Sequence, residues 1–154
     1  ILIIITNSGG LSMPELIRDL RSMLIRDEGG KQRRLYYVNG IPHIGVGHNL
    51  QAKAVSNRVV EIMFEDDLYD AQHELLTRLP WTQQLDEVRR AVLVNMVFNM
   101  GLQGLIDNNP LGLAACERGD YAETARQMLD GPWKDQVGPR APRLARQMET
   151  GLWA

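Results

Sequence analysis

Apolar residues recur at steps of three and four along much of the chain, which is the spacing of helices with one buried face. Residues 12–28 begin with a Ser-Met-Pro-Glu capping box, and Gly29-Gly30 stops the helix that they predict. A second helical pattern runs from Ser56 to Pro80. Residues 86–100 are apolar on nearly every side, which predicts a helix inside the core. Shorter helices are expected from Pro110, from Asp120 to Gly131 and from Arg140 to Thr150 with Gly151 as its stop.

A hairpin is predicted between the first two helices. Asn39-Gly40 separates two β-prone runs, Leu35–Val38 and Ile41–Val46. Asn-Gly between such runs is the strongest short-range hairpin signal. Pro42 has no N–H, so we expect it to confine the second run to an edge or a bulge. Together these patterns predict an α+β fold that is mostly helical with one small hairpin.

Composition narrows the class of protein. The chain has 154 residues, of which 44% are hydrophobic and 23% charged, and this excludes a disordered chain. Seventeen basic against nineteen acidic residues give a net charge of -2, which argues against a DNA-binding helical module. Cys116 is the single cysteine, so no internal disulfide can form, and no Cys/His cluster has zinc spacing. No apolar run reaches the length of a membrane span, and no metal or organic cofactor is implied.

The chain is expected to divide into a tail and one domain. Residues 1–11 begin with Ile-Leu-Ile-Ile-Ile, carry no Met and continue into a Gly-rich linker, whereas the patterned part is residues 12–154. The tail is interpreted as a short strand or a processing remnant, with the end of a longer export segment as the alternative. Within the domain we expect a small hairpin lobe at about 28–55 and a helical lobe at about 56–154.

Residues 28–48 carry the candidate chemistry. Glu28 ends the first predicted helix, and the hairpin that follows at once carries His43 on its second strand. Because the hairpin folds back beside the helix end, Glu28 and His43 can face each other across a groove. The partial negative charge of a helix C-terminus, together with burial, disfavours an ionised carboxylate there. A carboxylic acid that stays protonated can donate its proton to a glycosidic oxygen.

This segment resembles the phage-type lysozymes, glycoside hydrolase family 24. Their pattern is a helix-ending Glu-Gly, a hairpin and then Thr-Ile-Gly-x-Gly-His, and this chain has Glu28-Gly29 and His43-Ile-Gly-Val-Gly-His48 at the same interval. Residues 88–101 are similar to the long central helix of that family. Its C-terminal pattern is matched in order and spacing by Trp133, Arg140, Arg143 and residues 150–153. The resemblance covers about residues 14–154.

The resemblance implies a lysozyme-like fold, with a substrate cleft between a hairpin lobe and a helical lobe. It implies a muramidase, a hydrolase that cleaves the β-1,4 bond between N-acetylmuramic acid and N-acetylglucosamine in peptidoglycan. Glu28 falls on the general acid of the family, and His48 and Asp67 fall on a structural ion pair. Residues expected at or near bound glycan are Tyr37, Phe98, Asn99, Trp133 and Arg140. Trp133 is either a sugar-stacking platform or a core residue, and Trp153 is expected in the core.

Two departures from the family pattern change the expected chemistry. Nine residues after the Glu, the family has an acidic residue or Cys, and this chain has Tyr37. Fifteen residues after the Glu, the family has a Thr that positions the attacking water, and this chain has His43. A glycosidase with two carboxylates needs one as acid and the other as base or nucleophile. The expected second carboxylate is therefore missing.

Four interpretations follow from its absence. In the first interpretation, His43 acts as the base. In the second, the protein is a lytic transglycosylase in which Glu28 alone serves as acid and then as base, and the product is an anhydro-sugar. In the third, Asp27 supplies the missing second carboxylate, although its side chain points about 100° away from that of Glu28 around the helix. In the fourth, the site is inactive and the protein is a non-catalytic peptidoglycan-binding or phage structural module. The first is the leading hypothesis: a monomeric endolysin, or the lysozyme domain of a virion component, that acts on the bacterial cell wall in the periplasm.

Overall fold

The computed structural model describes the backbone of residues 13–154 and the side chains from Ile17 onward. The predicted Ser12 cap and the tail of residues 1–11 lie outside the described residues. The chain divides into two compact units, residues 1–57 and 58–154. Among the described residues, no helix is both long and apolar enough to cross a membrane.

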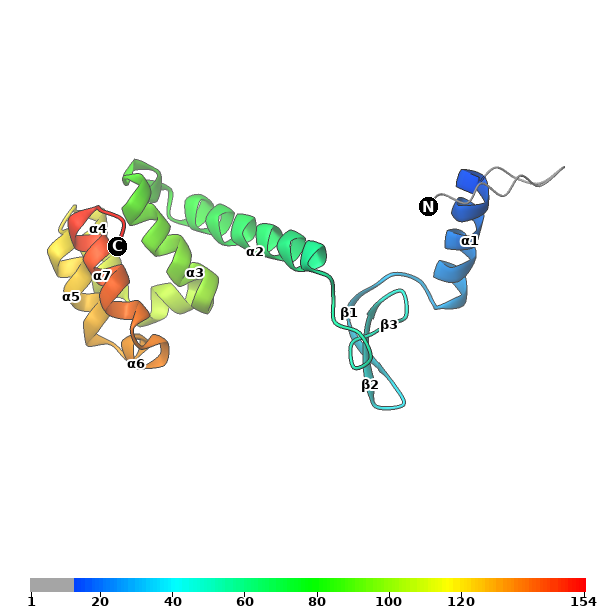
Figure 1. The fold of residues 1–154 in the computed structure, drawn as a ribbon. Helices are drawn as coiled ribbons and strands as arrows, with labels where there is room; N and C mark the ends of the chain where they lie inside the picture. The colour runs from blue at the N-terminus through cyan, green and yellow to red at the C-terminus, as the bar shows by residue number, and fades with distance from the viewer. Residues whose placement is uncertain (1–12) are drawn as a thin grey trace. The chain divides into compact units, whose positions relative to one another are not determined.

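The first unit contains one helix and a small antiparallel sheet. Helix α1 spans Met13–Asp27, and strands β1, β2 and β3 span Gln32–Val38, Ile41–Gly45 and His48–Asn49. Asn39 and Gly40 have φ values of 51° and 77°, which is the left-handed pair that a two-residue hairpin turn requires. The predicted hairpin is therefore confirmed (Figure 1).

The expectation that Pro42 confines its strand to an edge is wrong, because β2 is the central strand in the order β1-β2-β3. The alternative, a bulge, has a counterpart in the ladder of β1 with β2, whose register shifts between Gln32 and Tyr36. Strand β3 pairs with β2 only through His43–Asn49 and Ile44–His48. Pro42 therefore lies beyond the end of that two-residue ladder, where its missing N–H breaks no bond of the ladder. Its carbonyl still accepts a hydrogen bond from the Leu50 N–H, at 2.9 Å.

The second unit is helical. Its elements are α2 (Asn57–Arg78), a 3₁₀ helix (Pro80–Gln84), α3 (Glu87–Asn108), α4 (Pro110–Glu117), α5 (Tyr121–Asp130), α6 (Trp133–Val137) and α7 (Arg140–Thr150). Figure 1 shows α4 to α7 gathered against α3, and the most extensive helix contacts are those of α5 with α7 and α4. The predicted helices are confirmed, whereas the 3₁₀ helix and α6 were not predicted.

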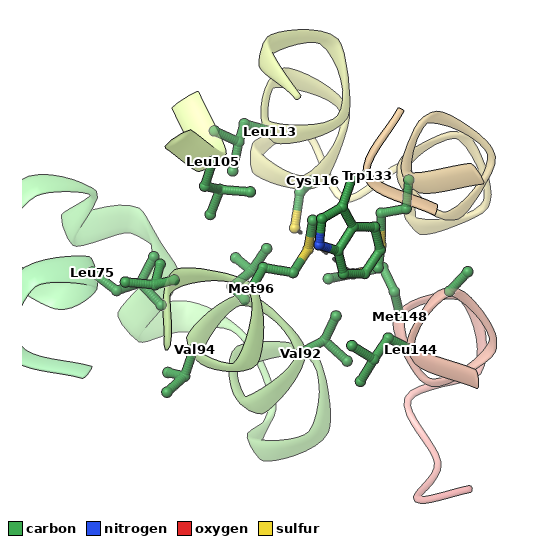
Figure 2. Packing of buried hydrophobic residues seen from close by; sticks show 14 of the residues in the cluster. Leu75, Val92, Val94, Met96, Leu105, Leu113, Cys116, Trp133, Leu144 and Met148 are labelled. Carbon is green, nitrogen blue, oxygen red and sulfur yellow. Dashed lines mark hydrogen bonds between the residues drawn. The ribbon is translucent and has the colours of Figure 1, made fainter. Parts of the chain in front are cut away.

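The core of this unit is built around α3. Val92, Leu93 and Met96 are each 1% exposed, as expected for a helix that is apolar on most sides. Figure 2 shows Met96 among side chains from α2, α4, α6 and α7, which include Leu75, Cys116, Trp133 and Met148. At Gly101 the φ of 73° bends α3, since this conformation interrupts the helical backbone.

Trp153 is not a core residue, contrary to its prediction, since it is 64% exposed. The reason is the end of α7. Gly151 adopts the left-handed conformation and its N–H bonds the Gln147 carbonyl, so the chain leaves the helix before it reaches Trp153.

Cys116 gives a pH-dependent prediction. Burial raises the pKa of its thiol to about 11, and the charge of Asp86 adds to this, while Arg89 and Thr124 oppose it. The unfolded thiol ionises near its ordinary value of 9.0, so the unfolded chain releases the proton first. Stability is expected to be unaffected by this group below about pH 9, and to fall as the pH rises from about 9 to 11.

The free energy of unfolding, measured by urea titration across this alkaline range, checks the prediction. A Cys116→Ala variant should lose this part of the pH dependence. In the folded wild type the ratio of thiolate to thiol should be about 100-fold lower than in the unfolded chain at the same pH, because the two pKa values differ by about two. An equal alkaline slope for wild type and variant would contradict it.

Candidate active site

Glu28 is held at the end of α1 by a Schellman turn. The Gly29 N–H bonds the Arg26 carbonyl at 3.1 Å, and the Gly30 N–H bonds the Ile25 carbonyl at 2.7 Å. Gly29 and Gly30 have φ values of 77° and 96°, a conformation that glycine adopts without steric cost. The Gly-Gly pair therefore fixes where α1 stops and makes Glu28 its C-cap residue.

The Glu28 carboxyl lies against the turn between β2 and β3. A Cβ built on Gly47 would lie 2.7 Å from Glu28 Oε2 and 3.0 Å from its Cδ. Only a glycine at this position allows the carboxyl to approach so closely. Glu28 is nevertheless an exposed residue of its unit, so the burial expected from the sequence is not found within that unit.

We expect Gly47→Ala to lower catalytic activity by about ten- to a hundredfold, because the new methyl group displaces the Glu28 carboxyl. The matched control is Gly40→Ala. Gly40 has a similar φ of 77°, but a Cβ there meets nothing within 4 Å, so it carries the backbone strain alone. Turnover rates on purified peptidoglycan check the prediction, and an equal loss in both variants would contradict it.

His43 is oriented by two neighbours on the hairpin. Its Nδ1 lies 2.9 Å from the Ile41 carbonyl oxygen, which can only accept a hydrogen bond. In the neutral ring Nδ1 therefore carries the proton and Nε2 keeps its lone pair. The His43 ring lies 5.7 Å from the ring of Tyr36, its partner across the strands.

Tyr36 also reaches the turn that contacts Glu28. Its hydroxyl accepts a hydrogen bond from the Gly47 N–H at 3.1 Å. The amide of Gly47 is thus bonded to Tyr36, and the Glu28 carboxyl lies beside the α-carbon of Gly47, where other residues carry a Cβ. These contacts bring Glu28, Gly47, Tyr36 and His43 together in one part of the first unit.

Tyr37 points away from this group. It is 65% exposed and pairs with Pro42, and neighbouring residues of a strand face opposite sides of the sheet. The other nearby carboxylate, that of Asp27, accepts a hydrogen bond from Arg26 Nε at 3.0 Å. His48 Nε2 lies 3.0 Å from the Lys53 carbonyl oxygen. Its ion pair with Asp67, a residue of the other unit, stays a prediction.

The second unit carries its own cleft, of about 520 Å³. Phe64 of α2 and Phe98 of α3 line it with their ring centroids 5.8 Å apart, and Arg140 at the start of α7 contributes a positive charge. Asn95 also lines the cleft, and its buried Oδ1 has no hydrogen-bond partner among the described residues. Sequence reasoning missed Asn95, although its place in the otherwise apolar stretch of residues 91–98 was a visible signal.

Trp133 is in the core, which is one of the two roles that the sequence left open. The residue is 5% exposed, and its indole N–H donates a hydrogen bond to Asn99 Oδ1 at 3.2 Å. A buried indole cannot offer its face to a sugar ring, whereas it can hold an exposed amide in place. Asn99 is the exposed partner of this pair.

Comparison with known families identifies the family of this chain. The model of the family described as phage lysozyme matches residues 26–149. This match begins just before Glu28 and includes the hairpin and every helix from α2 to α6. The chain belongs to the phage lysozyme family.

Individual relatives of this phage lysozyme family member are distant. "Probable T4-type lysozyme 1" of Dictyostelium discoideum is 25% identical over 88% of this chain and 96% of its own length. "Probable T4-type lysozyme 2" of the same organism is 24% identical with the same coverage. Pre-baseplate central spike protein Gp5 of Enterobacteria phage T4 is 28% identical over 86% of this chain, but the match spans 28% of Gp5.

The α+β, mostly helical fold with its small sheet is that of a lysozyme-like protein. Besides Asn95, Tyr36 is a residue of the candidate site that the sequence did not reveal. Its role depends on the reach of one side chain from β1 to the turn after β2, and no local pattern encodes that distance.

Proposed function

We propose that this chain is a muramidase that cleaves the β-1,4 bond between N-acetylmuramic acid and N-acetylglucosamine in bacterial peptidoglycan, with Glu28 as the general acid. The observation that carries the proposal is the fixed position of Glu28. It is the C-cap residue of α1, and its carboxyl lies against Gly47, within the segment that the family model matches. A carboxylic acid held in this way can protonate the glycosidic oxygen as the bond breaks.

His43 is the proposed base. The Ile41 carbonyl holds the proton on Nδ1, so Nε2 can accept a proton from a water molecule that attacks the sugar. This assignment explains how the chain can work with Tyr37 at the position where its family has an acidic residue or Cys.

We expect His43→Ala to keep its fold and to lower the rate of peptidoglycan cleavage by about a hundredfold or more, because one proton acceptor is lost. His73→Ala is the matched control, since His73 is a histidine of α2 whose ring stacks on Tyr69. Cleavage rates and circular dichroism spectra of both variants check this. Full activity of His43→Ala would exclude His43 as the base.

A single-Glu lytic transglycosylase is the alternative that the missing carboxylate favours. In that reaction Glu28 protonates the glycosidic oxygen and becomes a carboxylate. The carboxylate then accepts the proton of the C6 hydroxyl of the same muramic acid as that oxygen bonds to C1, which closes an anhydro ring. Glu28 is thereby returned to its acid form, so no second side chain is required.

A third candidate is a phage structural module that binds glycan without cleaving it. The similarity to Gp5, whose name describes a central spike protein, favours this candidate. It predicts that the chain sediments with peptidoglycan and releases nothing from it.

The nature of the products separates these functions. Purified peptidoglycan is incubated with the protein, and the soluble fragments are analysed by mass spectrometry. Fragments that end in reducing N-acetylmuramic acid are the expected result. Fragments that are lower in mass by one water and carry an anhydro end would show that the reaction is that of a transglycosylase and not a hydrolysis. Sedimentation with peptidoglycan and no soluble fragment would overturn the enzymatic proposal.

Phe98, Asn99 and Arg140 are the proposed glycan contacts in addition to the catalytic pair. Tyr37 is a proposed contact only for glycan that extends beyond this pair, because its side chain faces the opposite side of the sheet from Tyr36. Phe98 is 44% exposed, so its ring can pack on a sugar, while Arg140 brings positive charge to the cleft of the second unit. Trp133 is proposed to support Asn99 through its indole N–H. The proposed site of action is the bacterial cell wall, with the protein made as a phage endolysin or carried in the virion.

A further inference from the structure

Tyr36 contacts His43 directly and is linked to Glu28 through the backbone of Gly47. Its ring packs beside that of His43, and its hydroxyl bonds the Gly47 amide, against which the Glu28 carboxyl lies. We propose that Tyr36 is a positioning residue, which holds the imidazole of His43 and the carboxyl of Glu28 at a set separation through Gly47. This inference rests on the proposed function.

The imidazole is held from two directions. The Ile41 carbonyl holds Nδ1 at one edge, at 2.9 Å, and the tilted Tyr36 ring packs beside the imidazole at 5.7 Å between centroids. Offset or tilted packing at this distance is the favourable arrangement for two aromatic rings. Together the two contacts restrict both the rotation and the tilt of the ring, so Nε2 keeps one direction.

The tyrosine ring is itself held at both ends. Its backbone pairs with His43 across the two strands, and its hydroxyl is tied to the Gly47 N–H at 3.1 Å. Gly47 has a φ of 68°, so its amide is presented by a turn that other residues adopt only with strain. The half-buried tyrosine therefore connects β1 to the turn that carries the Glu28 contact.

Two replacements separate the hydroxyl from the ring. Tyr36→Phe removes the bond to Gly47 and keeps the ring, whereas Tyr36→Leu removes both. Tyr69→Phe is the matched control, because Tyr69 is a 65% exposed tyrosine of α2 whose hydroxyl makes no hydrogen bond among the described residues. We expect Tyr36→Phe to lower kcat about fivefold and Tyr36→Leu about twentyfold, with KM unchanged, since neither change removes a group that we assign to substrate.

A double-mutant cycle tests whether the ring acts through His43. The step from Phe to Leu at position 36 is made in the wild-type background and in the His43→Ala background. It should lower kcat in the first background and change it less than twofold in the second. An equal loss in both backgrounds would show a merely structural role and overturn the inference. A fully active His43→Ala variant would instead contradict the proposed function, so the two failures are distinct.

Nuclear magnetic resonance provides a test that needs no residual activity. The Gly47 amide should exchange with solvent at least several-fold faster in Tyr36→Phe than in Tyr69→Phe, because it loses its acceptor. The His43 ring proton shifts should be retained in Tyr36→Phe and altered in Tyr36→Leu. Unchanged Gly47 exchange together with unchanged His43 shifts in a folded Tyr36→Leu variant would also overturn the inference.

Discussion

Replacing Glu28 by Gln is expected to lower the rate of peptidoglycan cleavage by about 10²–10⁴-fold, which is the range for the loss of one general acid. Gln has the shape of Glu, so the contact with Gly47 and the Schellman turn can both remain. The amide has no acidic proton to give to the glycosidic oxygen. Binding to peptidoglycan should change little, because the variant keeps every contact except the proton transfer.

The control for this variant is Glu117→Gln. Glu117 is an exposed glutamate at the C-terminal end of α4, so it shares the helix-end position of Glu28 without the contact to a glycine turn. Initial rates of fragment release and pull-down with insoluble peptidoglycan measure catalysis and binding separately. An Asp27→Asn variant extends the test. If Asp27→Asn were inactive and Glu28→Gln were active, the general acid would be Asp27 and not Glu28.

Replacing Arg89 by Ala is expected to destabilise the helical unit by about 3 kcal/mol, the largest stability effect that we predict. Arg89 lies in the first turn of α3 and is only 15% exposed. Its Nε and Nη2 donate hydrogen bonds to the carbonyls of Met148 and Glu149, both at 2.8 Å. Those carbonyls belong to the last turn of α7, where the helix itself supplies no partner.

Two further contacts depend on the same guanidinium. It lies 3.8 Å from the ring centroid of Tyr121, and its Nη1 bonds Asp86 Oδ2 at 2.6 Å. Burial acts to raise the pKa of Asp86, but the hydrogen bonds and the charge of Arg89 hold this pKa below its ordinary value. Truncation therefore leaves two helix carbonyls without their donor, and it leaves the Asp86 carboxylate with only the bond from the backbone N–H of residue 89. The midpoint of thermal unfolding of this unit of about 100 residues should fall by about 12–24 °C.

Arg126→Ala is the matched control for this experiment. Arg126 is 60% exposed, and its close bonds to Glu123 join two residues of the same helix. Exposed pairs of this kind contribute about 0–1 kcal/mol, so the control should lose little. Arg89→Lys should lie between, because one ammonium group cannot replace a planar fork. Equal midpoints for Arg89→Ala and Arg126→Ala would contradict the role of Arg89 in joining α3 to α7.

Much of the fold could be predicted from short-range patterns. The Asn39-Gly40 turn, the Asp120 cap and the Gly151 stop each act over a few residues, and the structure contains all three. For the same reason the local pattern was enough to place Glu28 at a helix end and His43 on the second strand of the hairpin. Periodicity also identified α3 as the buried helix.

The sequence by itself determined the order of the elements and the residues that carry the candidate chemistry, because caps, turns and helical spacing are local. Only the tertiary structure decided which side chains meet. Arg89 bonds a carbonyl 59 positions away, Trp133 is buried against α3 and bonds Asn99, and Tyr36 reaches over β2 to Gly47. These contacts depend on how segments that are far apart in the chain pack together. The residues next to a side chain in the sequence do not identify a partner that is distant in the sequence.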